Sequence, residues 1–188
     1  MHESPPAAAP AGDPAPATAT MPTLPAAALK RIDQALFDAL AAQARRSPRL
    51  RCNHNLHAEP DAVQRFLNML QPGTYVRPHR HLRTDATGFE CVVVLQGAVG
   101  LLLLDAHGQV LQRERLDAAG PLRGAELAQG RFHTLVALAP DSVVFEVKQG
   151  PYLGAADKDF LPQFPAEGTP QAARQEQLWR GLFNGGQT

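Results

Sequence analysis

The sequence predicts a mainly β protein, a sandwich or barrel of short strands with helices packed outside it. Short apolar and β-branched segments recur at regular intervals through the middle of the chain, which is typical of an all-β domain. Helical periodicity appears towards the two ends. The expected strands are residues 74–80, 90–96, 98–104, 109–116, 124–128, 133–139 and 142–149.

The flanking segments follow from composition and periodicity. An Ala/Pro/Thr-rich segment cannot bury a core and is expected to be a disordered tail. Apolar residues recurring every three or four positions predict helices at 26–46, 60–70 and 171–183. The predicted organisation is a disordered tail (1–25), a helical N-terminal segment packed on the barrel (26–70), the barrel itself (71–168) and a C-terminal helix (169–188).

Three histidines and one glutamate stand at the ends of predicted strands. His79 and His81 are two residues apart, so a strand would point both side chains to the same face. Glu90 and His133 each open an apolar run that is too hydrophobic for a loop. Imidazoles and a carboxylate are ligand types for divalent first-row metals. The joint pattern favours a metal site, although each residue alone has an ordinary structural explanation.

A second cluster, Cys52-x-His54-x2-His57, precedes the predicted barrel. Its spacing matches no standard zinc pattern well, so it is expected to be a polar segment over the barrel mouth.

The spacing of these residues resembles that of the cupin superfamily. The first cupin motif, G(x)5HxH(x)3-4E(x)6G, matches at Gly73, His79, His81, Glu90 and Gly97, and the second at Gly130 and His133. Eight residues separate His81 from Glu90, where the motif has three or four. Asp85 lies at the spacing that the motif gives to its carboxylate, so it is a rival carboxylate ligand. The resemblance implies a cupin-type double-stranded β-helix, or jelly-roll barrel, with His79, His81, Glu90 and His133 as metal ligands.

A narrower resemblance links the chain to the WbuC family of cupin-fold metalloproteins. Members of that family are found with genes for O-antigen and other surface polysaccharide synthesis, so the resemblance implies a link to that pathway. The matching segments are 47–57, Gln64, 72–81, 145–152 and 157–160.

The alternation of side chains between the two faces of a strand suggests which residues surround the metal. If His79 and His81 face the barrel interior, Tyr75 and Arg77 face it as well. Arg77 would then clamp a substrate carboxylate or phosphate; alternatively it lies at the barrel rim or pairs internally with Glu146. Tyr75 and Glu146 are the candidate proton carriers. The remaining candidates, which would line or edge the pocket and bind substrate, are Lys148, Tyr152 and Lys158.

Composition excludes several classes of protein. The 188 residues carry 18 Lys plus Arg against 18 Asp plus Glu, so nothing suggests binding to nucleic acid or to an anionic membrane. Two cysteines do not make a disulfide scaffold. No apolar stretch is long enough to span a membrane, and the N-terminal residues lack signal-peptide features. A cytoplasmic location is expected.

These observations predict a metal-dependent enzyme that acts on a small anionic or sugar-derived metabolite. An isomerase, an epimerase and a dioxygenase fit equally well, and the metal would be one divalent ion of iron, manganese, nickel, cobalt or zinc. The alternatives are a non-catalytic cupin that binds a sugar or carboxylate, and a structural protein stabilised by its metal. Strands 90–95 and 99–104 are apolar on both faces, and a homodimer or the helices would supply their cover.

Overall fold

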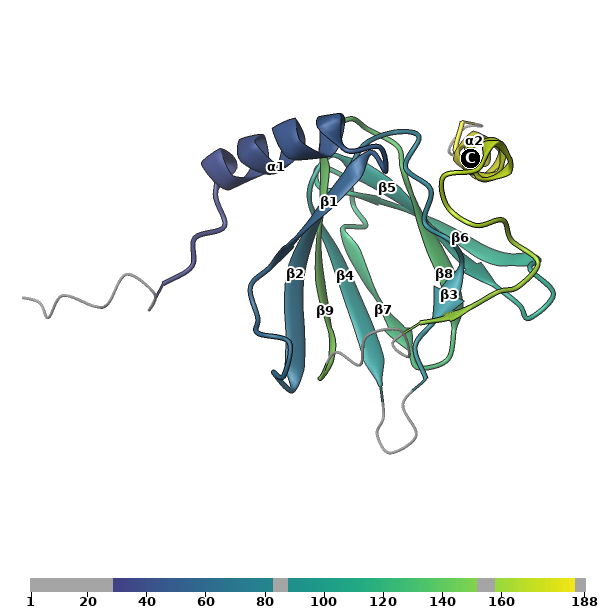
Figure 1. The fold of residues 1–188 in the computed structure, drawn as a ribbon, viewed down its shortest axis with the longest axis horizontal. Coiled ribbons are helices and arrows are strands. Elements are labelled where there is room, and N and C mark those ends of the chain that lie inside the picture. Colours follow the sequence, from purple (N-terminus) through teal and green to yellow (C-terminus); the bar gives the residue numbers. More distant parts are fainter. Residues whose placement is uncertain (1–28, 83–87, 152–157, 185–188) are drawn as a thin grey trace, which may run out of the picture. The chain divides into compact units, whose positions relative to one another are not determined.

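Two five-stranded antiparallel sheets face each other in the computed structural model (Figure 1), which describes residues 29–82, 88–151 and 158–184. The first sheet contains, in spatial order, β1 (Arg51–Asn55), β2 (Val63–Leu70), β9 (Ser142–Gln149), β4 (Phe89–Gln96) and β7 (Gly124–Ala128). The second contains β10 (Asp159–Phe160), β3 (His79–Arg80), β8 (Phe132–Ala137), β5 (Ala98–Leu104) and β6 (Val110–Asp117).

The strand order identifies a jelly roll. If the strands from β2 to β9 are counted from one to eight, the first sheet has the order 1-8-3-6 and the second 2-7-4-5. This is the arrangement in which an eight-stranded ribbon is wrapped into two Greek-key sheets. The short strands β1 and β10 each extend one edge. The predicted mainly β jelly-roll barrel with flanking helices is therefore confirmed.

An apolar core fills one part of the space between the sheets. It is formed by inward-facing side chains that alternate along the strands with residues on the outer faces. The buried members are Leu70, Val92, Val94, Val99, Leu101, Leu116, Leu127, Leu135, Ala137 and Val144. Leu70 and Leu135 also line a cavity between the sheets, so the cavity lies directly against this core.

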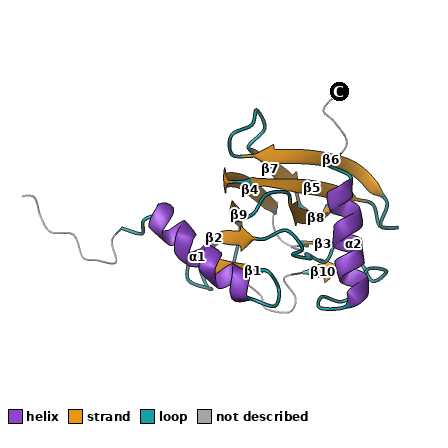
Figure 2. Cartoon of the chain, turned by 90° about the horizontal axis from the view of Figure 1, so that it is seen from above, coloured by secondary structure: helices purple, strands orange, loops and turns teal. Residues whose placement is uncertain are grey.

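Helix α1 (Gln34–Arg46) packs on the outer face of the first sheet (Figure 2). Its buried residues, among them Phe37 and Leu40, contact Leu67 and Met69 of β2. The helix begins later than the sequence predicted, because the Asp33 side chain caps it by accepting a hydrogen bond from the Leu36 amide.

The helix predicted at 60–70 is wrong, because this segment is strand β2. Gln64, Phe66, Asn68 and Leu70 point into the cavity, and Leu67 and Met69 point towards α1. A strand that is covered on both faces has apolar residues at spacings that also fit a helix, so periodicity alone misassigned it. The predicted helical segment 26–70 is one helix followed by an antiparallel pair, β1 and β2.

The strand predicted at 74–80 is also shorter than expected, since only His79–Arg80 is paired. The other predicted strands agree with the observed ones to within one or two residues.

Helix α2 (Pro170–Gly181) packs on the outer face of the second sheet, as Figure 2 shows. Thr169 caps it, and Pro170 occupies its first turn. Trp179 stacks on Tyr75 with ring centroids 5.8 Å apart, and Phe183 lies over Gly100. In the described ranges, no helix is both long enough and apolar enough to cross a membrane.

Candidate metal centre

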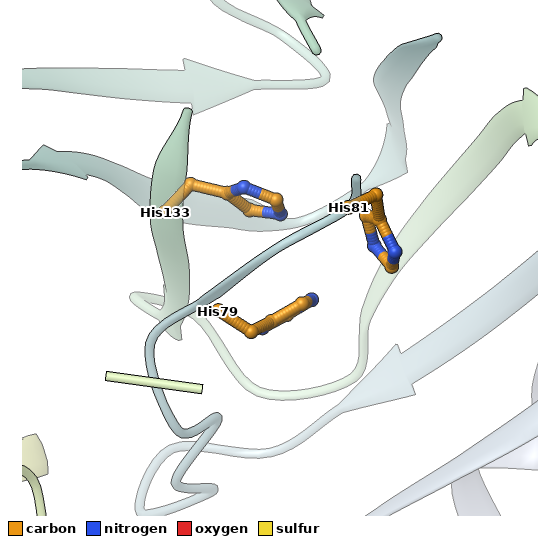
Figure 3. Close-up of side chains that lie close together, drawn as sticks. All are labelled: His79, His81 and His133. Carbon is orange, nitrogen blue, oxygen red and sulfur yellow. The ribbon is translucent and has the colours of Figure 1, made fainter. Parts of the chain in front are cut away.

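Three imidazoles converge inside the barrel. His79 belongs to β3, His81 follows that strand, and His133 lies directly opposite His79 on β8. One ring nitrogen from each lies within 4.8 Å of the other two, and Figure 3 shows the rings turned towards a common point. His79 and His133 are buried, and His81 is partly exposed. Three converging nitrogen donors are a suitable ligand set for a first-row transition metal.

Backbone carbonyl groups orient two of the rings. Nδ1 of His79 lies 3.0 Å from the Arg77 carbonyl oxygen, and Nδ1 of His133 lies 3.0 Å from that of Arg131. A carbonyl oxygen only accepts, so Nδ1 carries the proton in both rings. In the neutral ring, Nε2 then presents its lone pair to the centre. Metal-binding histidines are commonly held in place by such a hydrogen bond from the ring nitrogen that does not bind the metal.

Glu90 reaches the same point from the opposite sheet. Its Oε2 atom lies 3.0 Å from Nε2 of His133 and 3.4 Å from Nε2 of His81. Glu90 is only 7% exposed. With Nδ1 of His133 protonated, the lone pairs of its Nε2 atom and of the Glu90 carboxylate face each other at 3.0 Å. Such an arrangement requires a cation between them, either a proton on a histidine or a metal ion.

The electrostatics of the cluster favour an ionised Glu90 and a neutral His79, both competent to bind a metal. Burial raises the pKa of Glu90, but the neighbouring imidazoles, His133 first, outweigh burial and hold the pKa well below its usual range. Burial also moves the pKa of His79 well below its usual value, so its ring is neutral. For His133 burial lowers the pKa, yet the charge and hydrogen bond of Glu90 leave it raised. A metal ion would therefore displace a proton from His133.

The histidines open onto a cavity of about 410 Å³, a size that suits a small metabolite. Its walls are part polar and part apolar, and Asn53, Asn68 and Lys148 are among the polar lining residues. Glu146 lies in this wall, where the Asn68 amide donates a 2.5 Å hydrogen bond to its carboxyl group. Burial, reinforced by the charge of Glu90, raises the pKa of Glu146 to about 7. A carboxyl group with this pKa can give or take a proton near neutral pH.

Two predicted site residues lie elsewhere. Tyr75 is packed against Trp179, and its hydroxyl donates to the Pro165 carbonyl oxygen. Arg77 donates to the Leu161 carbonyl oxygen. Neither side chain lines the cavity, and Glu146 pairs with Asn68 rather than with Arg77. The prediction that Tyr75 and Arg77 face the barrel interior with His79 assumed that residues 74–78 are part of a strand. They are not, so the alternation of side chains that starts at His79 does not extend back to them.

Of the other candidates, Lys148 and Lys158 line the cavity, whereas Asp85 and Tyr152 lie outside the described residues. The Cys52, His54 and His57 cluster is dispersed. Cys52 donates to the Leu40 carbonyl oxygen, and His57 bonds the backbone of Arg65. In the described part of the chain, only the three histidines of the centre form a potential metal-binding group.

The sequence argument missed two polar residues of the cavity wall, Gln64 and Asn68 of β2. Their alternation with outward-facing residues would have revealed them if 63–70 had been assigned as a strand. Asn53 and Asn55 of β1 also line the cavity, and they belong to the segment that was expected to lie over the barrel mouth.

Comparison with known proteins gives few matches by sequence. Residues 32–116 match a family described as a domain of unknown function (DUF6016). No curated protein matches the chain.

Among solved structures, KdgF from Halomonas sp. is 23% identical, with a TM-score of 0.42 over 53% of this chain and 79% of KdgF. An oxalate oxidase in complex with the substrate analogue glycolate is 15% identical, with a TM-score of 0.47 over 76% of each chain. The capsular polysaccharide assembling protein CapF from Staphylococcus aureus is 19% identical, with a TM-score of 0.44 over 54% of this chain and only 27% of CapF. The assignment of this chain as a jelly-roll protein with a three-histidine centre rests on its own strand order and side chains.

Proposed function

We propose that the protein is a metal-dependent enzyme that acts on a small anionic or sugar-derived metabolite. The observation that carries the proposal is the convergence of three histidine nitrogens beside Glu90 at the wall of an open cavity. His79, His81, His133 and Glu90 would hold one divalent ion of iron, manganese, cobalt, nickel or zinc. When bound, such an ion polarises a substrate oxygen or supports oxygen chemistry.

The chain's own residues support a reaction rather than a purely structural site. Three histidines and one carboxylate leave coordination positions open in a six-coordinate ion, and these positions would face the cavity. Glu146 lies in the same wall with a pKa raised to about 7 by burial, so it is suited to move a proton to or from a bound substrate. Isomerisation, epimerisation and dioxygenation all remain within this proposal.

The resemblance of segments 47–57, 72–81, 145–152 and 157–160 to the WbuC family extends the proposal to surface-polysaccharide (O-antigen) synthesis. The cavity suits such a role, because its amide side chains, including Asn53, Asn55 and Asn68, can hydrogen-bond the hydroxyl groups of a sugar.

Elemental analysis of the purified protein tests the centre. The parent should bind about one equivalent of metal per chain, and the His79→Ala, His81→Ala double variant should bind none. His107→Ala is the matched control, because His107 lies in an exposed turn. Absence of metal from the parent after reconstitution with each of the five ions would refute the proposal.

A second measurement separates an enzyme from a binding protein. Candidate sugars and carboxylates are incubated with the metal-loaded parent and with Glu146→Gln, and both binding and turnover are followed. Turnover that the variant loses while it keeps binding supports an enzyme. Binding by the parent without turnover of any bound compound favours a non-catalytic sugar- or carboxylate-binding protein.

A further inference from the structure

A row of three polar side chains crosses the cavity wall next to the metal centre. Lys148 of β9 pairs in register with Gln64 of β2 on one side and with Glu90 of β4 on the other. These strands are adjacent in Figure 1, and all three residues line the cavity. Since neighbouring strands lie about 4.8 Å apart, the row extends about 10 Å from Glu90 to Gln64.

Gln64 is buried without a partner for its amide nitrogen. The residue is 1% exposed, and its Nε2 atom makes no hydrogen bond to any residue that the structure describes. A buried donor without an acceptor destabilises the folded protein, so such groups are rare. Gln64 faces the cavity, where an oxygen atom of a ligand would supply the missing acceptor.

Lys148 places a positive charge beside this amide. Its side chain is 6% exposed, and its Nζ atom lies 5.7 Å from the centre of the Phe66 ring, which also lines the cavity. An ammonium group and an amide N–H on neighbouring strands are both donors. A ligand group that can accept hydrogen bonds from both donors, and that is attracted by the positive charge, is one that only accepts and carries negative charge, as a carboxylate does.

We propose that Gln64 and Lys148 form a carboxylate-binding subsite, and that the ligand is a polyhydroxylated carboxylate reaching from this subsite to the metal centre. The inference rests on the proposed function and narrows its substrate class. A chain of four to six carbons spans roughly 5–8 Å, which fits within the row of about 10 Å. The hydroxyl groups would meet the amides of Asn53, Asn55 and Asn68.

Calorimetric titration with matched pairs of probes tests the subsite. D-gluconate is compared with D-glucitol, and L-threonate with L-threitol, because each pair differs only in the carboxylate. The parent should bind at least one carboxylate about 10-fold more tightly than its neutral partner, since hydrogen bonds to charged groups are the strong ones. Gln64→Leu and Lys148→Met should each lose that preference. The exposed Gln112 of β6 supplies the control variant Gln112→Leu, which should keep it.

A stability measurement separates a ligand-binding role of Gln64 from a structural one. Without ligand, Gln64→Leu should melt at a higher temperature than the parent, because it removes a buried donor that has no partner. A lower melting temperature would mean that the amide stabilises the folded protein, which would overturn the inference. If Gln64→Leu fails to fold, Gln64→Glu replaces it, and this variant should bind the carboxylate no better than the polyol.

The titrations are run on metal-stripped and metal-loaded protein, so that the two proposals can fail separately. Equal affinity of the parent for carboxylate and polyol in both forms overturns the subsite, whatever the metal content. A carboxylate preference that depends on Gln64 in a protein that binds no metal supports the subsite and refutes the metal-dependent enzyme.

Discussion

Replacement of Glu146 by glutamine should change how the stability of the metal-stripped protein depends on pH. Burial raises the pKa of this carboxyl group from 4.5 to about 7. The folded protein therefore keeps a proton that the unfolded chain has already released, and folding loses stability as the pH rises from about 4.5 to about 7. At 1.36 kcal/mol per pH unit, the loss amounts to about 3 kcal/mol.

Glutamine is uncharged at every pH in this range and can still accept the hydrogen bond that Asn68 donates. Glu146→Gln should thus match the parent near pH 4.5 and exceed its unfolding free energy by about 3 kcal/mol near pH 8. Urea unfolding across this range, after metal removal with a chelator, gives the difference directly. The exposed Glu126 of β7 supplies the control, since Glu126→Gln should keep the pH dependence of the parent.

A difference between parent and Glu146→Gln that stays constant from pH 4.5 to 8 would refute the reasoning. It would mean that the carboxyl group is solvated in the folded protein, and that Glu146 is not suited to carry a proton in the cavity.

Three further results are expected. Trp179→Ala should cost about 3–5 kcal/mol in urea unfolding, because the buried ring stacks on Tyr75; a loss below about 1 kcal/mol would show that α2 contributes little packing. Gly100→Ala should cost about 1–3 kcal/mol, because its Cβ would lie 2.3 Å from the Phe183 ring. That cost should disappear in a Phe183→Ala background, and its persistence there would assign it to another contact. Metal binding should release a proton and weaken as the pH falls, because Glu90 raises the pKa of His133; titration in buffers of different ionisation enthalpy measures the release, and none would be seen if His133 were already neutral.

The strands of the barrel could be predicted where the local sequence showed a single hydrophobic pattern, either a continuous apolar run or a strict alternation. Residues 90–96, 98–104 and 142–149 are apolar or alternating runs bounded by turn residues, and they appear as β4, β5 and β9. Segment 63–70 was not predictable in this way, because α1 covers one of its faces and the cavity the other. Both faces then carry large side chains, and the period of two disappears from the sequence.

His79 and His81 were identified from sequence because spacing within one short segment sets how their side chains point. His79 and His81 need no distant partner to share a face, whereas the extension of that argument to Tyr75 and Arg77 assumed a strand over 74–80, and the strand begins only at His79. Arg77 instead donates to the Leu161 carbonyl oxygen, a contact between segments far apart in the chain.

Residue type and spacing thus determine the ligand chemistry of this protein, because imidazole and carboxylate groups keep their donor properties in any fold. The row of Gln64, Lys148 and Glu90 arises only on folding, since the register of β2, β9 and β4 brings together residues from three distant parts of the chain. The raised pKa of Glu146 likewise needs the closed barrel, because burial is its principal cause. Burial and cross-strand register depend on the whole chain, and no local stretch of sequence specifies either.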